Sequence, residues 1–295
     1  MKTPMTRPIE FVPTLRRAHA TAGLLLALLA PVPAAALDTV GVVAGGSITY
    51  VFRICSTCDT PSDTVADETK DHPGSRGPVI VSHYATLGTA QADVYARAMI
   101  VGNDAVPQLA AKAGATPGIG SHAGFSEEGA YLPGASAFAR AVQQYHYTGS
   151  TLQEYVLGYS LTGYAASQGS PPIYADVQVS GGLALHDGKD PNVELPLGGL
   201  VDVSQRSVNG SALSFNQNGA VAITLSPGES FFLSSFLSAN VSQGGWGLAD
   251  ASNTLDVFFT AGDTSQLTPM LSPVSEPGAW ALLLLGLAAG RAMLV

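Results

Sequence analysis

The sequence predicts an all-β protein whose body, residues 37–265, is an antiparallel β-sandwich of jelly-roll-like type. Apolar and polar residues alternate with the period of a strand in several segments, most clearly in Ala90–Val101. Asp-Gly and Asn-Gly pairs, which favour tight turns between antiparallel strands, separate later strand-like runs. No segment carries an equally clear helical pattern, although an Ala-rich helix is an alternative for Ala90–Val101.

β-Branched, aromatic and alternating residues define the expected strands in chain order. We expect them at Ser47–Ile54, Val79–Leu87, Ala90–Val101, Ala135–Tyr147, Leu152–Tyr164, Tyr174–His186, Glu229–Val241 and Thr254–Ala261. We expect the turns of a meander at Asp187-Gly188, Asn209-Gly210, Asn218-Gly219 and Pro227-Gly228. The polar segment Asp59–Gly77 predicts a surface loop, and Gln108–Ala113 a helical turn or two. Residues 266–274, which contain Pro269 and Pro273, predict a linker.

The N-terminus predicts a secretory signal peptide over residues 1–36. Arg16 and Arg17 precede the apolar segment Ala22–Ala30, which Pro31-Val32-Pro33 ends. Small residues follow at Ala34 and Ala36, the positions that signal peptidase reads, so we expect cleavage after Ala36. The chain is therefore expected to be exported, and the residues around the two arginines fit the twin-arginine route poorly.

The charge balance excludes two classes of partner. The formal net charge is −9, and removing residues 1–36 takes away more basic side chains than acidic ones. An acidic exported body repels nucleic acid and anionic lipid, so neither is an expected partner. Hydrophobic residues make up 46% of the chain and charged residues 12%, which is too apolar for general disorder.

The only two cysteines, Cys55 and Cys58, form a Cys-x-x-Cys pair. An exported chain meets an oxidising compartment, so a short-loop disulfide between them is the favoured interpretation. A redox-active pair is an alternative that needs a helix N-terminus to lower a thiol pKa. A zinc site is another alternative, which would need a histidine such as His72 or His83.

The C-terminal segment 275–295 predicts a short membrane-associated helix. Pro277-Gly278 ends any preceding element, and Trp280 suits a membrane–water interface. The apolar run Ala279–Gly290 is shorter than the roughly 20 residues that span a hydrocarbon core. Arg291 can reach the headgroups and is expected on the cytoplasmic side. Such a tail holds a membrane weakly, as suits a signal that is read and removed.

This tail resembles the PEP-CTERM sorting domain, in which Pro-Glu-Pro precedes a short hydrophobic helix and a basic end. The matching residues are Ser275, Glu276, Pro277, Gly278, Trp280, Leu282, Leu283, Leu284, Leu285 and Arg291, with Ser275 in place of the first proline. The resemblance implies an exported protein of a Gram-negative bacterium, cut by an exosortase and released to the cell surface or matrix. It assigns processing to residues 275–278, membrane retention to Trp280 and the leucines, and topology to Arg291.

Two segments of the body resemble the ends of sandwich domains that are common in the same family. They are Leu225–Phe231, with a Pro-Gly-Glu turn that opens a strand, and Ala249–Leu255, with an Asp-x-Ser-Asn-Thr-Leu run expected to precede the last strand. This part of the resemblance implies architecture and no chemistry.

The sequence indicates no catalytic residues, no metal site and no cofactor. The histidines are scattered and form no zinc-protease pattern, and Glu127-Glu128 are adjacent rather than facing each other across a cleft. Weak calcium candidates are His186–Asn192, better explained by a turn, and the acids Asp59, Asp63, Asp67, Glu68 and Asp71. A sugar-stacking face is a further candidate, although simple packing is the favoured interpretation of its tyrosines. They are Tyr145, Tyr147, Tyr155, Tyr159, Tyr164 and Tyr174.

We therefore expect a non-enzymatic cell-surface or extracellular-matrix protein that is retained with exopolysaccharide in a biofilm. Its expected partners are signal peptidase, an exosortase-like protease, the membrane through the C-terminal helix, and polysaccharide. A carbohydrate-binding module of β-sandwich type is the alternative, and a hydrolase with two distant facing carboxylates is a third hypothesis.

Overall fold

The computed structural model of the chain describes residues 40–54, 62–123, 125–168, 175–188, 201–207 and 210–270. These residues form strands joined by turns, together with a short 3-10 turn at Thr264–Gln266. No helix among them is both long enough and apolar enough to cross a membrane. The predicted signal peptide, the two cysteines and the sorting tail lie outside the described residues.

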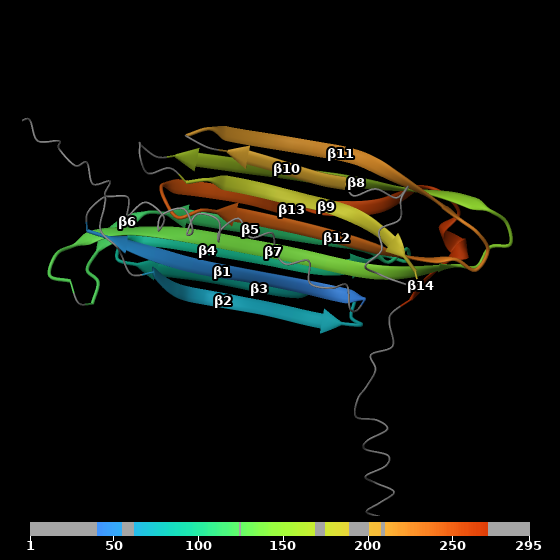
Figure 1. Cartoon of the computed structure of the whole chain (residues 1–295), viewed down its shortest axis with the longest axis horizontal. Helices are drawn as coiled ribbons and strands as arrows, with labels where there is room; N and C mark the ends of the chain where they lie inside the picture. Colours follow the sequence, from blue (N-terminus) through green and yellow to red (C-terminus); the bar gives the residue numbers. More distant parts are fainter. Residues whose placement is uncertain are drawn as a thin grey trace, which may run out of the picture. The chain divides into compact units, whose positions relative to one another are not determined.

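The described strands form two antiparallel sheets that pack face to face, which confirms the predicted all-β sandwich (Figure 1). Sheet A has the order β10 (Val201–Ser207), β9 (Val177–Asp187), β12 (Ser230–Val241), β7 (Gly129–Tyr147), β1 (Gly41–Arg53) and β2 (Ser62–Pro73). Two short strands, β6 (Gly118–Gly120) and β14 (Leu267–Met270), also pair with β7. Sheet B has the order β11 (Ala212–Leu225), β8 (Gln153–Gln168), β13 (Trp246–Ala261), β5 (Val106–Thr116), β4 (Ala90–Val101) and β3 (Val79–Leu87).

The connections after β7 do not form the predicted meander, because most of them change sheets. The chain passes from β7 in sheet A to β8 in sheet B, back to β9, and later from β11 in sheet B to β12 in sheet A. The last of these uses the predicted turn at Pro227-Gly228, where Gly228 has a φ of 82°. A turn signal marks where a strand ends but does not specify its partner strand.

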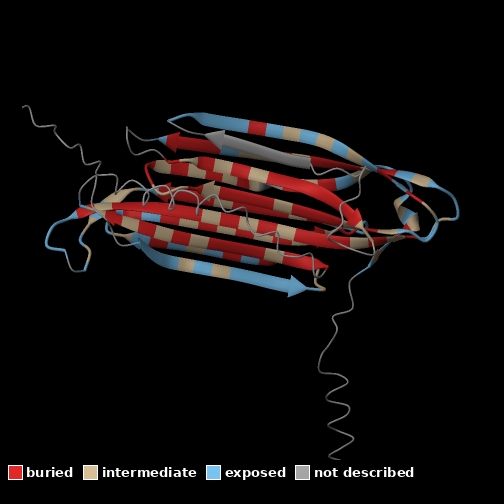
Figure 2. Cartoon of the chain, in the orientation of Figure 1, coloured by how far each residue is buried: buried red, intermediate tan, exposed pale blue. Residues whose placement is uncertain are grey.

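Three local predictions were wrong because tertiary pairing overrides weak local patterns. Ser62–Pro73 was predicted as a loop but pairs with β1 as an edge strand whose side chains are largely exposed (Figure 2). Val106–Thr116 covers the predicted helical turn and pairs with both β4 and β13. The predicted turn at Asn218-Gly219 lies inside β11, paired with Ser160 and Tyr159 of β8.

The predicted linker also begins with ordered structure. Leu267–Met270 forms β14 and pairs with residues 147–144 of β7. Asp263 precedes it and accepts hydrogen bonds from Ser265 and Gln266, which lower the pKa of its carboxyl. The sheets therefore extend beyond the predicted body boundary at residue 265.

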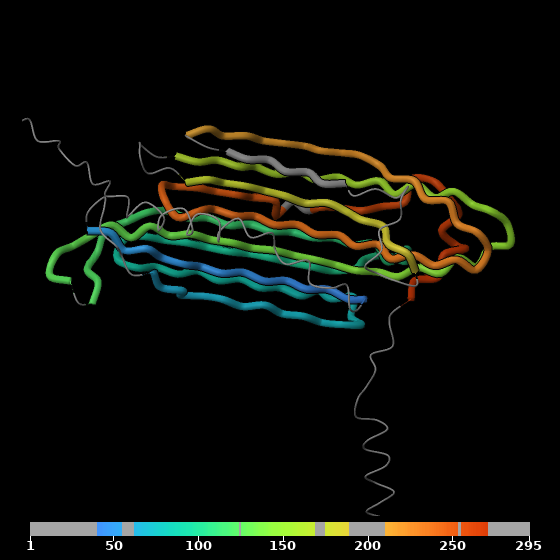
Figure 3. The backbone as a smooth tube through the Cα atoms, in the orientation of Figure 1, coloured from blue at the N-terminus to red at the C-terminus, as the bar shows by residue number. Residues whose placement is uncertain are grey.

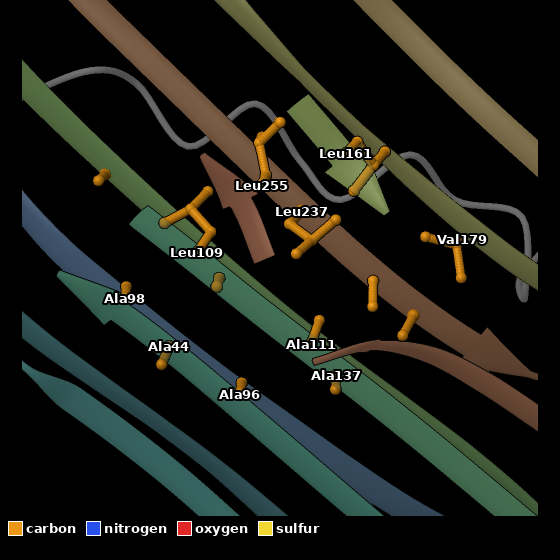
Figure 4. Packing of buried hydrophobic residues seen from close by; sticks show 14 of the residues in the cluster. Ala44, Ala96, Ala98, Leu109, Ala111, Ala137, Leu161, Val179, Leu237 and Leu255 are labelled. Atoms are coloured by element: carbon orange, nitrogen blue, oxygen red, sulfur yellow. The ribbon is translucent and has the colours of Figure 1, made fainter. Parts of the chain in front are cut away.

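The core between the sheets combines alanines with larger apolar side chains, some of which are drawn in Figure 4. Several buried alanines come from β1, β4, β5 and β7, namely Ala44, Ala96, Ala98, Ala111 and Ala137. Larger buried side chains come from β8, β9, β12 and β13, including Leu161, Val179, Leu237 and Leu255, and from β1, including Tyr50. Gly46 of β1 faces β4 so closely that a Cβ atom there would lie 2.9 Å from Cγ2 of Val94. The two sheets are therefore closely packed where Gly46 faces Val94.

The two ends of the sheet structure meet at the central strand β7. Gly41, the first residue of β1, pairs with Val142, and Met270, the last of β14, pairs with Gln144. Because β12 occupies the other edge of β7 here, β14 and β1 follow each other along the same edge (Figure 3). Nε2 of Gln143 donates to the carbonyl of Met270 at 2.9 Å, at the gap between them.

Candidate functional site

The predicted sorting, cleavage and disulfide residues lie outside the described part of the chain. They are Ala34, Ala36, Cys55, Cys58, Ser275, Glu276, Pro277, Gly278, Trp280, Leu282, Leu283, Leu284, Leu285 and Arg291. In the described part of the chain, the hydrogen-bonded tyrosines, the ion pairs and the exposed aromatic rings discussed below lie at the rims of the sandwich and on the outer face of sheet B.

The candidate sugar-stacking face is not formed, because most of its tyrosines pack inside the sandwich, as the favoured interpretation predicts. The buried members are Tyr145, Tyr147, Tyr155 and Tyr159. Tyr164 is 36% exposed, and Tyr174 lies outside the described residues. The tyrosines of this set therefore do not form one surface.

The buried tyrosines pack their rings in the core and use their hydroxyl groups at its rim. The hydroxyl of Tyr145 donates to the carbonyls of Asp104 at 3.0 Å and Ala105 at 2.8 Å, across to the turn between β4 and β5. The hydroxyl of Tyr155 donates to the carbonyl of Asp263 at 3.0 Å. Burial raises the pKa of Tyr145. Such a ring with a satisfied hydroxyl is a structural use of tyrosine.

The described acids of the second calcium candidate lie on β2, exposed or half-buried at the edge of sheet A. Glu68 forms an ion pair with Lys70 at 3.4 Å and lies 3.0 Å from Nε2 of His83, and Lys70 also donates to the carbonyl of Ile80. Within the described ranges, no group of three or more His, Cys, Asp or Glu side chains is placed to hold a metal ion. These contacts instead join β2 to β3 across the edge of the sandwich.

The outward-pointing residues of sheet B, hereafter the sheet B face, form the candidate site. Backbone pairing aligns Tyr95 of β4, Lys112 of β5, Asp250 of β13 and Tyr164 of β8 in one row across the sheet. Lys112 also forms an ion pair with Asp93 at 3.1 Å. This row places two aromatic rings on either side of a pair of opposite charges.

Two further aromatic rings are exposed on the sheet B face. Tyr84 of β3 is 65% exposed, and Phe258 of β13 is 43% exposed. The ring of Phe258 occupies the space above its register partner Gly158, where a Cβ atom would lie 2.5 Å from Cε2 of the ring. Exposed aromatic rings are thus distributed over β3, β13 and β8.

A second row of the sheet B face is a chain of polar side chains. Gln108, Asp256, Ser160 and Asn218 follow one another across β5, β13, β8 and β11. Nε2 of Gln108 donates to Asp256 at 2.9 Å, and Nη2 of Arg97 donates to Oε1 of Gln108 at 3.4 Å. The guanidinium and the carboxylate are thereby linked through the amide of Gln108.

A β-bulge in β13 lies between these two rows. The register of β13 against both β5 and β8 shifts between Asp250 and Leu255. Oδ1 of Asp250 accepts from the backbone N–H of Ser252 at 2.9 Å and from its hydroxyl at 2.6 Å. The segment expected to precede the last strand therefore lies within it, as a bulge that Asp250 stabilises.

No family model, curated protein or solved structure matches this chain. The sheet B face combines exposed rings with hydroxyl, amide and mutually paired charged groups, which suits a ligand that hydrogen-bonds and stacks. The alternation along Ala90–Val101 predicts from the sequence that Tyr95 faces outward. The residues beside Tyr95 on the neighbouring strands can be identified only from the strand pairing in the structure.

Proposed function

We propose that this protein is a non-enzymatic exported protein of the cell surface or extracellular matrix, delivered by its signal peptide and sorted by its C-terminal tail. The observation that carries the proposal is the segment Ser275–Arg291, with its Glu-Pro-Gly turn, interfacial Trp280, leucine run and terminal arginine. An exosortase-like protease processes this tail, and the released body is retained with matrix polysaccharide.

The organisation of the body supports this proposal. β14 pairs with β7 up to Met270, and only residues 271–274 separate it from Ser275. A protease that acts at residues 275–278 would therefore cut only a few residues beyond β14. A packed sandwich with an acidic surface strand is also suited to persist outside the cell, because it exposes few apolar side chains on that edge.

The proposal is tested by substituting Glu276→Ala in a Gram-negative host that carries an exosortase. We expect the variant to accumulate in the membrane fraction as a larger species, because processing needs the turn motif. Ser272→Ala, just outside the motif, is the matched control and should leave the distribution unchanged. An identical distribution of Glu276→Ala and the unsubstituted protein contradicts the sorting proposal.

The intact mass of the protein recovered from the cell surface provides an independent measurement. We expect a mature N-terminus after Ala36, loss of the hydrophobic tail and the mass deficit of a disulfide between Cys55 and Cys58. A cytosolic species with both end segments intact contradicts export.

A further inference from the structure

We propose that the sheet B face binds an uncharged polysaccharide chain, with its aromatic rings stacking on sugar rings and its polar rows hydrogen-bonding to sugar hydroxyls. This inference rests on the part of the proposed function that retains the body with matrix polysaccharide, and it does not depend on the sorting step. It concerns a surface different from the predicted tyrosine cluster, most of which is buried.

The spacing of the aromatic rings on the sheet B face suits a sugar chain. Tyr95 and Tyr164 lie in one row, separated by β5 and β13. Three strand spacings of about 4.8 Å put them about 14 Å apart, which suits an extended oligosaccharide lying across the strands. Phe258 and Tyr84 add exposed rings on the same face. Stacking uses the apolar faces of sugars, and rings held on a rigid sheet lose little conformational entropy on binding.

The charge of the face is the second argument, and it selects an uncharged ligand. Lys112 is paired with Asp93, and Arg97 is linked through Gln108 to Asp256. Asp250 is a further acid in the first row, so the acids Asp93, Asp250 and Asp256 outnumber the bases Lys112 and Arg97. These groups can donate to and accept from hydroxyl groups, and their small excess of negative charge disfavours an anionic polymer. The whole chain has a net charge of −9, so a uronate-rich polymer is repelled whereas a neutral polymer is not. Hydroxyl-rich neutral sugars are complementary to this surface.

The bulge of β13 is the third argument. It interrupts the regular pleat between the two rows and is held by two hydrogen bonds from Ser252 to Asp250. Bulges re-aim neighbouring side chains and are frequent beside binding sites. Here the bulge lies directly beside the row of Tyr95 and Tyr164, over which a sugar chain would pass.

The test is native affinity electrophoresis of the purified full chain in gels that contain soluble β-glucan, xylan, mannan or, as the acidic polymer, alginate. We expect retardation by at least one neutral polymer and not by alginate. Tyr164→Ala and Tyr95→Ala should each weaken binding at least tenfold, consistent with a stacking contact of about 1.4 kcal/mol or more. The effect should persist at high salt, because the ligand is uncharged.

Leu152→Ala is the matched control, because Leu152 is 69% exposed and precedes β8 at the rim of the sandwich. Circular dichroism and the urea midpoint establish that each variant is folded. The proposal is overturned if no neutral polymer retards the protein, or if both tyrosine variants bind as well as the control. It is also overturned if the tyrosine substitutions abolish self-association in sedimentation without any glycan binding, since the face would then be an interface between copies. Failure of glycan binding leaves the membrane-fraction test of Glu276→Ala unaffected, so the two proposals are judged separately.

Discussion

The ring of Phe138 in β7 occupies the space above Gly45 in β1, its register partner across the strand pair. The same arrangement recurs in sheet B, where an aromatic ring lies over a glycine of the adjacent strand. The recurring pairs are Phe258 with Gly158, Phe215 with Gly163, and Tyr159 with Gly219. A glycine in a strand has no side chain to pack, and the neighbouring ring covers the backbone that it leaves open.

Gly45→Ala is therefore expected to destabilise the fold. A Cβ atom at this position would overlap the ring of Phe138 and lie 3.0 Å from Oγ1 of Thr69. Overpacking of this kind costs about 1–3 kcal/mol in the free energy of unfolding, measurable by urea denaturation.

The control for this prediction is a double-mutant cycle with Phe138→Leu. Removing the ring should relieve the clash, so the double variant should be less destabilised than the sum of the two single variants. Additive single effects would show that the ring and the glycine are not coupled.

Tyr145→Phe is expected to lower the free energy of unfolding by about 1–2 kcal/mol, because the carbonyls of Asp104 and Ala105 lose their shared donor. Ala105 has a positive φ of 53°, so this turn depends on contacts from outside it. Tyr164→Phe, on the surface, should change stability little. Equal effects of the two substitutions in thermal unfolding would contradict the anchoring role of Tyr145.

The fold is expected to lose stability in alkali. The buried Tyr50 hydroxyl donates to the carbonyl of Ala85 in the opposite sheet at 2.8 Å, and burial, followed by the nearby Tyr84, raises the pKa of Tyr50 to about 12. A tyrosine whose folded pKa exceeds its unfolded value of 10.0 contributes stability that is complete below pH 10 and declines as the pH rises toward 12.

Urea unfolding at increasing pH measures this effect. Tyr50→Phe should be less stable than the unsubstituted protein near neutrality and should show a smaller decline between pH 10 and 12. An equal loss of unfolding free energy in both proteins between pH 10 and 12 would show that Tyr50 does not cause the loss of stability in alkali.

Asp250→Ala is expected to cost about 1–2 kcal/mol, because the bulge of β13 loses the acceptor for the N–H and hydroxyl of Ser252. Asp250→Asn keeps an acceptor oxygen and should retain most of the stability. Hydrogen exchange at Ser252 would report the local opening directly, and unchanged protection in Asp250→Ala would contradict this role.

The strands with one buried and one solvent-facing side were predictable from the sequence. The bounds predicted for Val79–Leu87 and Ala90–Val101 coincide with β3 and β4, because burial of one face imposes strict alternation. Ser62–Pro73 could not be recognised in this way, since both its faces are polar and it is held by pairing with β1 and by side-chain contacts with β3. The same limit applies to Val106–Thr116, whose alanines and glycine have weak strand preferences.

The candidate site was less predictable than the fold. Tyrosine is amphipathic, so its sequence position does not distinguish a core ring with a rim hydroxyl, such as Tyr145, from a surface ring, such as Tyr164. Strand order is set by connections that change sheets, and local sequence does not specify these. The row that joins Tyr95 to Tyr164 therefore emerges only from the three-dimensional pairing.

Met270 and Gly41 are neighbours along β7, so the first and last residues of the sheets lie close together. A short peptide could join these two residues, and new termini could then be placed in an exposed loop, as in a circular permutant, without distorting either sheet. For the same reason the body could be spliced into an exposed loop of another protein as a cassette. When both ends are held, a pulling force would act at one end of the central strand β7. The short strand β14 would then detach before the force reaches the longer strands.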